Sequence, residues 1–322
     1  MMWRVKVFSG TTSASLAQDV CRKLGIDPGR ADLRKFSDGE VHIQLLEDVR
    51  DADVFIINAT HPPMENLMEM ILLADAARRS SAKRVTLVPV YLGYNRQDRK
   101  DRPRVPISAR VVIDILSNSG ADRALLFDLH SEVTMGFFGR NMIVDHLYAS
   151  VASIPYLRTL LTSPFIVASP DKGGGPRAKA YATLLNQGDY VIFDKTRPEP
   201  GKVTRGSIKI IGDVKGRNVL LVDDLIDTAG TLIADAEAAM NADALSVYGY
   251  ATHFLASGDA ITRLDASPIK ELVVMDSIAH PAEKLQTSRL IITMLSIAPL
   301  LADAIRRIHD GDSLSSLFLS PK

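Results

Sequence analysis

The stretch "LLVDDLIDTAGT", residues 220–231, joins an apolar run to a polar turn. The run ends in two adjacent carboxylates, Asp223 and Asp224, and a third carboxylate, Asp227, follows three residues later. Residues 231–240, "TLIADAEAAM", are rich in helix-forming residues. This order predicts a strand, a turn and the N-terminus of a helix, where unpaired backbone N–H groups and the helix dipole attract anions.

The turn itself consists of small and hydroxyl-bearing residues. Ala229 and Gly230 leave the backbone accessible, and Thr228 and Thr231 add hydroxyl donors. Together with Asp227 they form a turn that suits a phosphate group at a helix N-terminus. It is not a Walker loop, since no Gly-Lys-Ser/Thr sequence follows. We therefore expect this turn to bind a phosphate group.

The carboxylates before the turn indicate what carries the phosphate. Ionised carboxylates accept hydrogen bonds and sugar hydroxyls donate them, so Asp223 and Asp224 suit a vicinal diol. A phosphate beside a diol describes a pentose 5-phosphate. The alternative is structural: Asp227 caps the helix, and the two adjacent carboxylates lie in a solvated loop. The concentration of carboxylates and hydroxyls around one turn favours the sugar-phosphate site.

The rest of the chain repeats this alternation of strand and helix. Short apolar runs occur at residues 53–59, 84–90, 123–129, 164–170, 218–224 and 271–276. Because these runs are apolar on both sides of the alternation, they are typical of strands covered on two faces, as in a parallel sheet. Helical patterns such as residues 64–80 and 229–244 separate them. This alternation predicts an α/β fold with right-handed crossovers.

The pattern occurs twice along the chain. Residues 85–97 resemble residues 165–178, and residues 124–130 resemble residues 220–227. We expect two similar domains, because domains usually hold roughly 100–200 residues. Their expected bounds are 1–150 and 151–303, and residues 304–322 are expected to form a helix and tail that pack back on the first domain.

The overall composition excludes several classes of partner. The 322 residues include 38 basic and 38 acidic side chains, so the formal net charge is zero. A neutral chain favours neither nucleic acid nor an anionic membrane as partner. No apolar run reaches the 18 residues of a membrane span, and the N-terminus lacks a signal-peptide pattern. With a single cysteine, Cys21, the sequence predicts a cytoplasmic protein without disulfides.

Five further stretches carry a resemblance to a known family. They are residues 36–50 (FSDGEVHIQLLEDVR), 94–110 (YNRQDRKDRPRVPISAR), 128–132 (DLHSE), 169–174 (SPDKGG) and 313–318 (SLSSLF). The stretch 219–231 is similar to the phosphoribosyl-pyrophosphate signature of the phosphoribosyltransferase fold. Together these stretches resemble the ribose-phosphate pyrophosphokinases over nearly the whole chain, from Val5 to Phe318. The resemblance implies two phosphoribosyltransferase-like domains, each a mainly parallel sheet flanked by helices.

The resemblance also implies a reaction and its participants. The pyrophosphoryl group of Mg-ATP would pass to the 1-hydroxyl of ribose 5-phosphate, giving 5-phosphoribosyl 1-pyrophosphate and AMP for nucleotide, His and Trp biosynthesis. The cofactor would be Mg²⁺, and the enzyme would be a homo-oligomer, a hexamer built from dimers. The ribose 5-phosphate site would comprise Arg197, Asp223, Asp224, Asp227, Thr228, Ala229, Gly230 and Thr231.

Two loops of the first half match ATP-binding positions of the family. Read without the family, the Asp-Gly pair at Asp38 indicates a turn between two strands. The resemblance implies instead that this loop reaches the adenine. The second loop, residues 94–104, follows an apolar strand and contains several arginines, so it is also expected to face an anion. The matching residues are Phe36, Asp38, Gly39, Glu40, Arg96 and Gln97.

Two strand ends match metal positions. The resemblance places Mg²⁺ at His130 and Asp171, with Asp128 as a nearby orienting group. Mg²⁺ prefers oxygen ligands and retains water, so His130 is expected to act partly through a water molecule. The sequence departs from the family after His130, at "SEVTM", residues 131–135, and Asp145 is a candidate replacement for a family aspartate nearby.

The segment 194–202, "DKTRPEPGK", has two interpretations. On composition alone it is a surface hairpin, because it is polar and interrupted by prolines. The resemblance makes it the mobile catalytic loop, in which Lys195 and Arg197 neutralise charge that develops during transfer. Two rival functions remain open at this point: a base phosphoribosyltransferase, which needs no adenine loop, and a non-catalytic relative of the pyrophosphokinases.

Regulation by phosphate is expected to be weak. In the family, phosphate binds at subunit contacts, and the matching candidates are Arg50, Ser81, Arg84, Ser313 and Ser315. Asp48 stands where the family commonly has Ser, and a carboxylate repels phosphate at short range.

Overall fold

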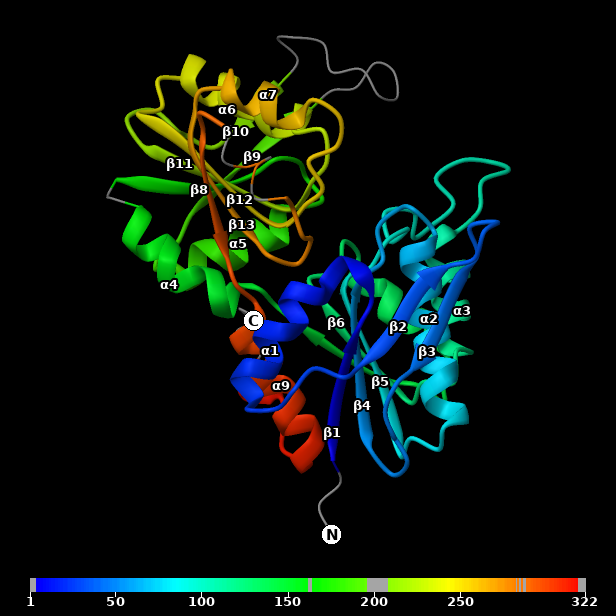
Figure 1. Cartoon of the computed structure of the whole chain (residues 1–322). Helices are drawn as coiled ribbons and strands as arrows, with labels where there is room; N and C mark the ends of the chain where they lie inside the picture. Colours follow the sequence, from blue (N-terminus) through cyan, green and yellow to red (C-terminus); the bar gives the residue numbers. More distant parts are fainter. Residues whose placement is uncertain are drawn as a thin grey trace. The chain divides into compact units, whose positions relative to one another are not determined.

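The computed structural model describes residues 4–161, 164–195, 208–281, 283, 285 and 288–317 (Figure 1). The described residues form two compact units. The first lies within residues 4–148, 277–279 and 297–317, and the second within residues 149–276 and 280–296. Both contain a mainly parallel sheet with helices, which confirms the predicted α/β fold.

The first unit is organised around a five-stranded parallel sheet in the order β1-β4-β5-β6-β7. Its strands are β1 (Val5–Ser9), β4 (Asp53–Ala59), β5 (Arg84–Tyr91), β6 (Arg123–Phe127) and β7 (Ile143–Leu147). Every residue of β4 is buried, as expected for a central strand covered on both faces.

Helices and a hairpin complete the first unit. The hairpin is antiparallel and joins β2 (Ala31–Lys35) to β3 (Val41–Leu45). The helices are α1 (Ala14–Leu24), α2 (Glu65–Arg79), α3 (Ser108–Ser117) and α9 (Ala298–Asp310), with short 3-10 segments at Thr11–Ser13, Glu132–Phe137 and Ser315–Leu317. Helices α1 and α9 pack side by side (Figure 1). Because α9 begins at Ala298, the boundary expected between 303 and 304 falls inside a helix.

The second unit contains a seven-stranded sheet in the order β10-β9-β8-β11-β12-β13-β14, parallel except for the β9–β10 pair. Its strands are β8 (Phe165–Ser169), β9 (Tyr190–Lys195), β10 (Ile208–Ile211), β11 (Asn218–Ile226), β12 (Ser246–Phe254), β13 (Ile269–Met275) and β14 (Ile291–Leu295). Its helices include α4 (Ser150–Leu160), α5 (Gly175–Leu184), α6 (Gly230–Asn241) and α7 (Ala260–Asp265). The strand expected at 218–224 therefore continues for two residues past the paired carboxylates.

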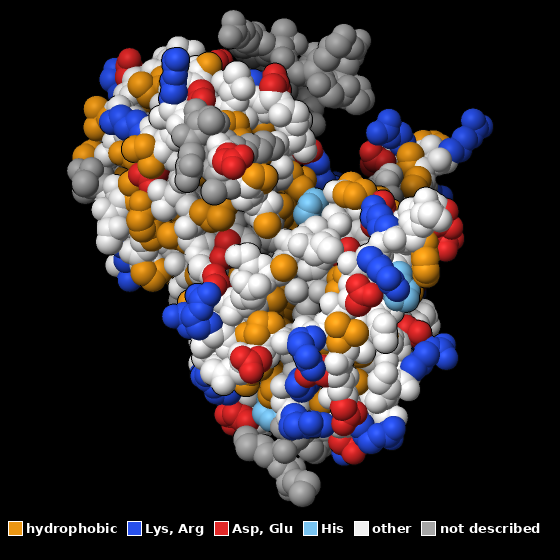
Figure 2. Space-filling model, in the orientation of Figure 1, with side chains coloured by type: hydrophobic (Ala, Val, Ile, Leu, Met, Phe, Trp, Pro, Cys, Tyr) orange, Lys and Arg blue, Asp and Glu red, His pale blue; other side chains and the backbone are white. Residues whose placement is uncertain are grey.

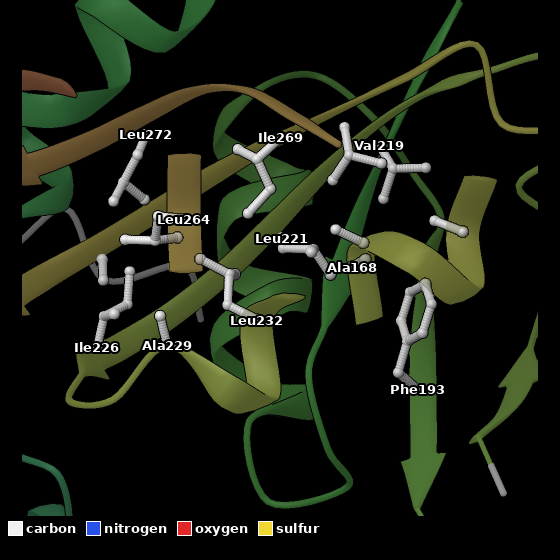
Figure 3. Close-up of a cluster of buried hydrophobic side chains, with 14 of the residues drawn as sticks. Ala168, Phe193, Val219, Leu221, Ile226, Ala229, Leu232, Leu264, Ile269 and Leu272 are labelled. Carbon is white, nitrogen blue, oxygen red and sulfur yellow. The ribbon is translucent and has the colours of Figure 1, made fainter. Parts of the chain in front are cut away.

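Buried apolar side chains from these elements form the core of the second unit. Leu221 of β11, Leu232 of α6 and Leu264 of α7 belong to one buried cluster (Figure 3). Burying such side chains contributes about 1.5–3 kcal/mol each to stability. This packing fixes where β11 ends and where α6 begins, and therefore where the intervening turn lies.

The distribution of surface charge and the character of the helices bear on the expected classes of partner. Acidic and basic side chains are interspersed on the face shown in Figure 2. In the part of the chain that the structure describes, none of the helices is both long and apolar enough to cross a membrane.

A buried carboxylate attaches the last helix to the first sheet. Asp53, at the start of β4, has no exposed surface. Arg84 Nε donates to Asp53 Oδ1 over 2.8 Å, and His309 Nδ1 of α9 lies 2.9 Å from Oδ2. Arg84 Nη2 also donates to the carbonyl of Ile308 over 2.8 Å. Removing one partner of such a group leaves an uncompensated buried charge.

We expect Asp53→Ala to lower the free energy of unfolding by about 3–5 kcal/mol, because Arg84 loses its buried counter-ion. The matched control is Asp75→Ala, which breaks the exposed Asp75–Arg79 pair (2.7 Å) on α2. An exposed pair of this kind contributes under about 1 kcal/mol. Urea unfolding of both variants measures the difference, and equal effects would contradict this account of Asp53.

Candidate functional site

The turn between β11 and α6 lies at the carboxyl end of a parallel strand, where ligands of α/β sheets bind. Ala229 occupies the N-cap position of α6, with φ 60° and ψ 1°. Its methyl side chain supplies no hydrogen-bond acceptor for the first N–H groups of the helix. A non-glycine residue in this left-handed conformation costs about 1–2 kcal/mol. The turn is thus held in a strained form at an N-terminus that suits an anion.

Contacts from other elements fix the shape of this turn. Arg263 Nη1 of α7 donates to the carbonyl of Thr228 over 3.1 Å, and the Ser257 N–H donates to the carbonyl of Asp227 over 3.0 Å. A Cβ added at Gly230 would lie 3.2 Å from Arg263 Nη2, so the guanidinium passes close to the backbone. Arg263 therefore adds positive charge beside the turn.

The two carboxylates of β11 share one arginine. Arg177 Nη1 of α5 donates to Asp224 Oδ1 over 2.7 Å and lies 3.9 Å from Asp223 Oδ1. The Asp224 N–H donates to Asp223 Oδ1 over 2.9 Å. Burial, and then the negative charge of Asp224, raise the pKa of Asp223 well above its usual value, while Arg177 opposes the rise. A hydrogen-bond donor or a cation beside the pair would therefore stabilise its ionised form.

Asp171 lies in the loop after β8, at the carboxyl edge of the same sheet. Its side chain is exposed, and its Oδ1 accepts a hydrogen bond from the Gly174 N–H over 2.8 Å. Ser169 Oγ donates to the Asp171 carbonyl over 2.6 Å, which braces the loop. Lys172 Nζ lies 2.8 Å from Asp194 Oδ2 and so links this loop to the end of β9.

Lys195 is the last residue of β9, and not a loop residue as expected. Its Nζ donates to Asp235 Oδ2 of α6 over 2.8 Å, and both side chains are buried. Burial raises the pKa of Asp235 to about 7, although Lys195 opposes the rise. Arg197 lies outside the described residues, so its assignment stays a prediction.

In the first unit, the residues expected to bind adenine form a hairpin turn between β2 and β3. The Phe36 N–H donates to the Glu40 carbonyl over 2.8 Å, and Asp38 Oδ1 accepts from the Glu40 N–H over 3.0 Å. Gly39 has φ 96°, a conformation that favours glycine. Phe36 is 52% exposed, with its ring edge-on to His42 at 5.1 Å between centroids. The turn therefore leaves the apolar ring of Phe36 half exposed.

The loop after β5 holds the second pair of expected ATP contacts. Arg96 is exposed, whereas Gln97 is partly buried, and its Oε1 accepts from Ser108 Oγ over 2.8 Å at the start of α3. Asn95 is buried, and neither its Oδ1 nor its Nδ2 has a hydrogen-bond partner among the described residues. The loop after β5 therefore exposes the Arg96 side chain and buries the Asn95 side chain.

The loop after β6 carries His130, which is exposed. Ser131 Oγ donates to Asp98 Oδ2 over 2.6 Å, which connects this loop with the loop after β5. Asp145 lies in β7 and pairs with Arg123 of the neighbouring strand β6, so a metal-binding role for Asp145 gains no support.

The expected metal residues belong to different units: His130 to the first and Asp171 to the second. No group of three or more His, Cys, Asp or Glu side chains that could hold a metal ion occurs among the described residues. The exposed carboxylate of Asp171 has the oxygen donors that Mg²⁺ prefers.

Several residues near the site have no signal in the local sequence pattern. Arg177, Asp235 and Arg263 come from three different helices and reach the strand ends only in the folded sheet. Each is charged, but none belongs to a motif that sequence reasoning recognises.

Comparisons with known proteins identify the family. A family model described as the N-terminal domain of ribose phosphate pyrophosphokinase matches residues 5–120, and one described as a phosphoribosyl synthetase-associated domain matches residues 167–319. Ribose-phosphate pyrophosphokinase from Chlorobaculum tepidum is 43% identical over 98% of this chain and 95% of that protein. The enzyme of the same name from Xanthomonas axonopodis is 45% identical over 97% of both chains.

A solved structure agrees with these sequence matches. The phosphoribosylpyrophosphate synthetase of Mycobacterium smegmatis superposes with a TM-score of 0.87 at 34% identity, covering 96% of this chain and 99% of that one. Identity above 40% over the full length, together with a matching fold, leads to one assignment. The chain belongs to the ribose-phosphate pyrophosphokinase family.

Proposed function

We propose that the turn between β11 and α6 binds the phosphate of ribose 5-phosphate in this ribose-phosphate pyrophosphokinase. The enzyme transfers the pyrophosphoryl group of ATP to the 1-hydroxyl of the sugar, giving 5-phosphoribosyl 1-pyrophosphate and AMP. The observation that carries the proposal is the N-terminus of α6, which lacks a side-chain acceptor at Ala229 and follows the paired carboxylates of β11.

In the proposed site, the phosphate accepts hydrogen bonds from the backbone of residues 228–231 and from the two threonine hydroxyls. Asp223 and Asp224 accept hydrogen bonds from the sugar diol, and Arg177 compensates their charge. The strand and the packed helix α6 fix these groups, so they would hold the 1-hydroxyl in a defined orientation. Such positioning supplies much of the rate gain in phosphoryl-type transfer.

Lys195 and Arg197 are proposed to stabilise the charge that develops between the sugar and the leaving AMP. The transfer breaks the bond between the β-phosphorus and the oxygen that bridges it to the α-phosphate, and this oxygen leaves with AMP. The 1-hydroxyl oxygen forms the new bond to the β-phosphorus as its proton leaves. No covalent enzyme intermediate is required.

The ATP-binding residues proposed for the first unit are Phe36, Asp38, Gly39, Glu40, Arg96 and Gln97. The exposed ring of Phe36 suits stacking on adenine, and the exposed Arg96 suits the triphosphate. Asp171 of the second unit is a proposed Mg²⁺ ligand, because its exposed carboxylate offers the oxygen donors that this ion prefers, and the ion would neutralise phosphate charge. His130 of the first unit is proposed on the resemblance alone, and would act through a water molecule.

We infer that the enzyme is a cytoplasmic homo-oligomer, a hexamer built from dimers. Exposed apolar side chains in the first unit support an assembly, notably Val111, Val133 and Ile143, which are 55%, 74% and 55% exposed. Cys21 is buried, and burial raises the pKa of its thiol to about 11, which fits an inert cysteine.

The reaction itself is tested by incubating the purified protein with ATP, ribose 5-phosphate and Mg²⁺. We expect AMP and 5-phosphoribosyl 1-pyrophosphate to form in equal amounts, which ³¹P NMR resolves. A base phosphoribosyltransferase would instead consume the activated sugar and release pyrophosphate. Absence of AMP formation would reject the proposed activity.

We expect Lys195→Ala to lower kcat by roughly 10²–10³-fold or more, the range for removing a charge-stabilising donor. The KM for ribose 5-phosphate should change little, because the phosphate contacts lie in the turn. The control is Lys209→Ala, which removes an exposed lysine from the adjacent strand β10. Steady-state kinetics of both variants decide the matter, and normal turnover of Lys195→Ala refutes the proposed role.

One candidate phosphate-regulation residue, Arg50, lies beside an acidic side chain. Asp48 Oδ1 accepts from the Arg50 N–H over 3.0 Å, and this bond is the main cause that lowers the pKa of Asp48. Asp48 is therefore ionised at neutral pH, within reach of Arg50. Arg84 is bonded to the buried Asp53, so part of its hydrogen-bonding capacity is already used.

We expect inorganic phosphate to change the rate by less than about twofold, because the Asp48 carboxylate repels the anion. In Asp48→Ser the activation should increase. Initial rates are measured over a phosphate series, with potassium chloride at equal ionic strength as the control. A steep phosphate requirement in the unchanged protein would show this expectation to be wrong.

A further inference from the structure

The Lys195–Asp235 pair is the most deeply buried Lys–Asp contact that the described residues show. The Lys195 side chain is 3% exposed and that of Asp235 is fully buried, with 2.8 Å between Nζ and Oδ2. Among the described residues, Asp235 Oδ1 has no hydrogen-bond partner. The lysine therefore provides the principal compensation for this carboxylate.

Keeping a carboxylate in this position is unfavourable. Asp235 lies on α6 beside Ala236, which belongs to the apolar core cluster of the second unit. Burial raises the pKa of Asp235 to about 7, Lys195 opposes this rise, and the negative charge of Asp171 adds to it. Replacing a buried ion pair by apolar residues is often neutral or stabilising, so stability alone does not account for the pair.

The position of Asp235 relative to the phosphate-binding turn suggests what the pair does. Asp235 is four residues after Thr231, so both lie on the same face of α6, separated by about 6 Å along the helix axis. The backbone of Lys195 is fixed independently, because it pairs with Ile208 across the β9–β10 ladder. Strand pairing thus fixes the backbone position of Lys195, and the contact with Asp235 fixes the position of its Nζ.

We propose that Asp235 is a positioning residue for the transfer reaction, which holds the Lys195 ammonium one helical turn from the sugar-phosphate turn. This inference rests on the proposed catalytic role of Lys195. Asp235 itself touches neither substrate. Its effect passes through the lysine: when the acid is removed, the long side chain of Lys195 samples many rotamers and reaches the reacting phosphates in only a fraction of them.

The test is a double-mutant cycle with Asp235→Asn, Lys195→Ala and the double variant. We expect Asp235→Asn to lower kcat by at least ~10-fold while the KM for ribose 5-phosphate stays within ~2-fold. The double variant should have the kcat of Lys195→Ala alone, because Asp235 acts only through the lysine. Asp243→Asn, which breaks the exposed Lys215–Asp243 pair at 3.2 Å, is the matched control and should leave kcat unchanged.

Thermal unfolding separates positioning from a merely structural role. Lys195→Ala leaves the Asp235 carboxylate buried without its cation, so we expect its Tm to fall and the double variant to regain part of the loss. Stability would then recover while activity does not. Asp235→Ser is made in parallel, and kinetics are compared for whichever single variant melts closest to the unchanged protein.

The possible outcomes are distinct. Wild-type kcat in the folded Asp235 variant, with Lys195→Ala impaired, overturns the positioning role and leaves the proposed function intact. Losses that multiply in the double variant also overturn it, because Asp235 would then act independently of Lys195. Normal kcat in Lys195→Ala overturns the proposed role of the lysine, and the positioning role with it.

Discussion

The positive N-terminal end of helix α6 is the constraint on which the site depends. An α-helix begins with N–H groups that need acceptors, and Ala229 at the N-cap position has no side-chain acceptor to offer. The packing of Leu221, Leu232 and their neighbours holds the strand and the helix that flank the turn. The same core therefore stabilises the second unit and keeps an anion-binding N-terminus at the end of β11.

Basic side chains from distant parts of the chain compensate the negative charge of the acids around this turn. Two adjacent carboxylates near the end of β11 repel each other, and Arg177 of α5 offsets part of that repulsion. A third acid, Asp235, is compensated by Lys195 in the same way. Each pairing joins residues separated by at least 40 positions, so the site exists only once the sheet has formed.

The sequence predicted the fold well because apolar runs such as residues 53–59 and 218–224 are covered on both faces in the structure. The β2–β3 hairpin was also foreseen from its Asp-Gly turn. Arg177, Arg263 and Asp235 were missed, because side chains brought together by tertiary packing leave no local spacing to recognise. Lys195 was expected in a loop, because the segment 194–202 is charged and interrupted by prolines. In the structure Lys195 still pairs with β10 and is the last residue of β9.

The position of α9 in the chain has a consequence for synthesis. This helix packs against α1, and its C-terminal turn meets the buried Asp53 of the first unit, yet it is encoded after the entire second unit. During translation the first sheet emerges early. Asp53 cannot contact His309 until nearly the whole polypeptide has been synthesised. The described residues of the second unit, 149–276 and 280–296, all precede α9 in the chain, so the domain that begins first is the one that finishes last.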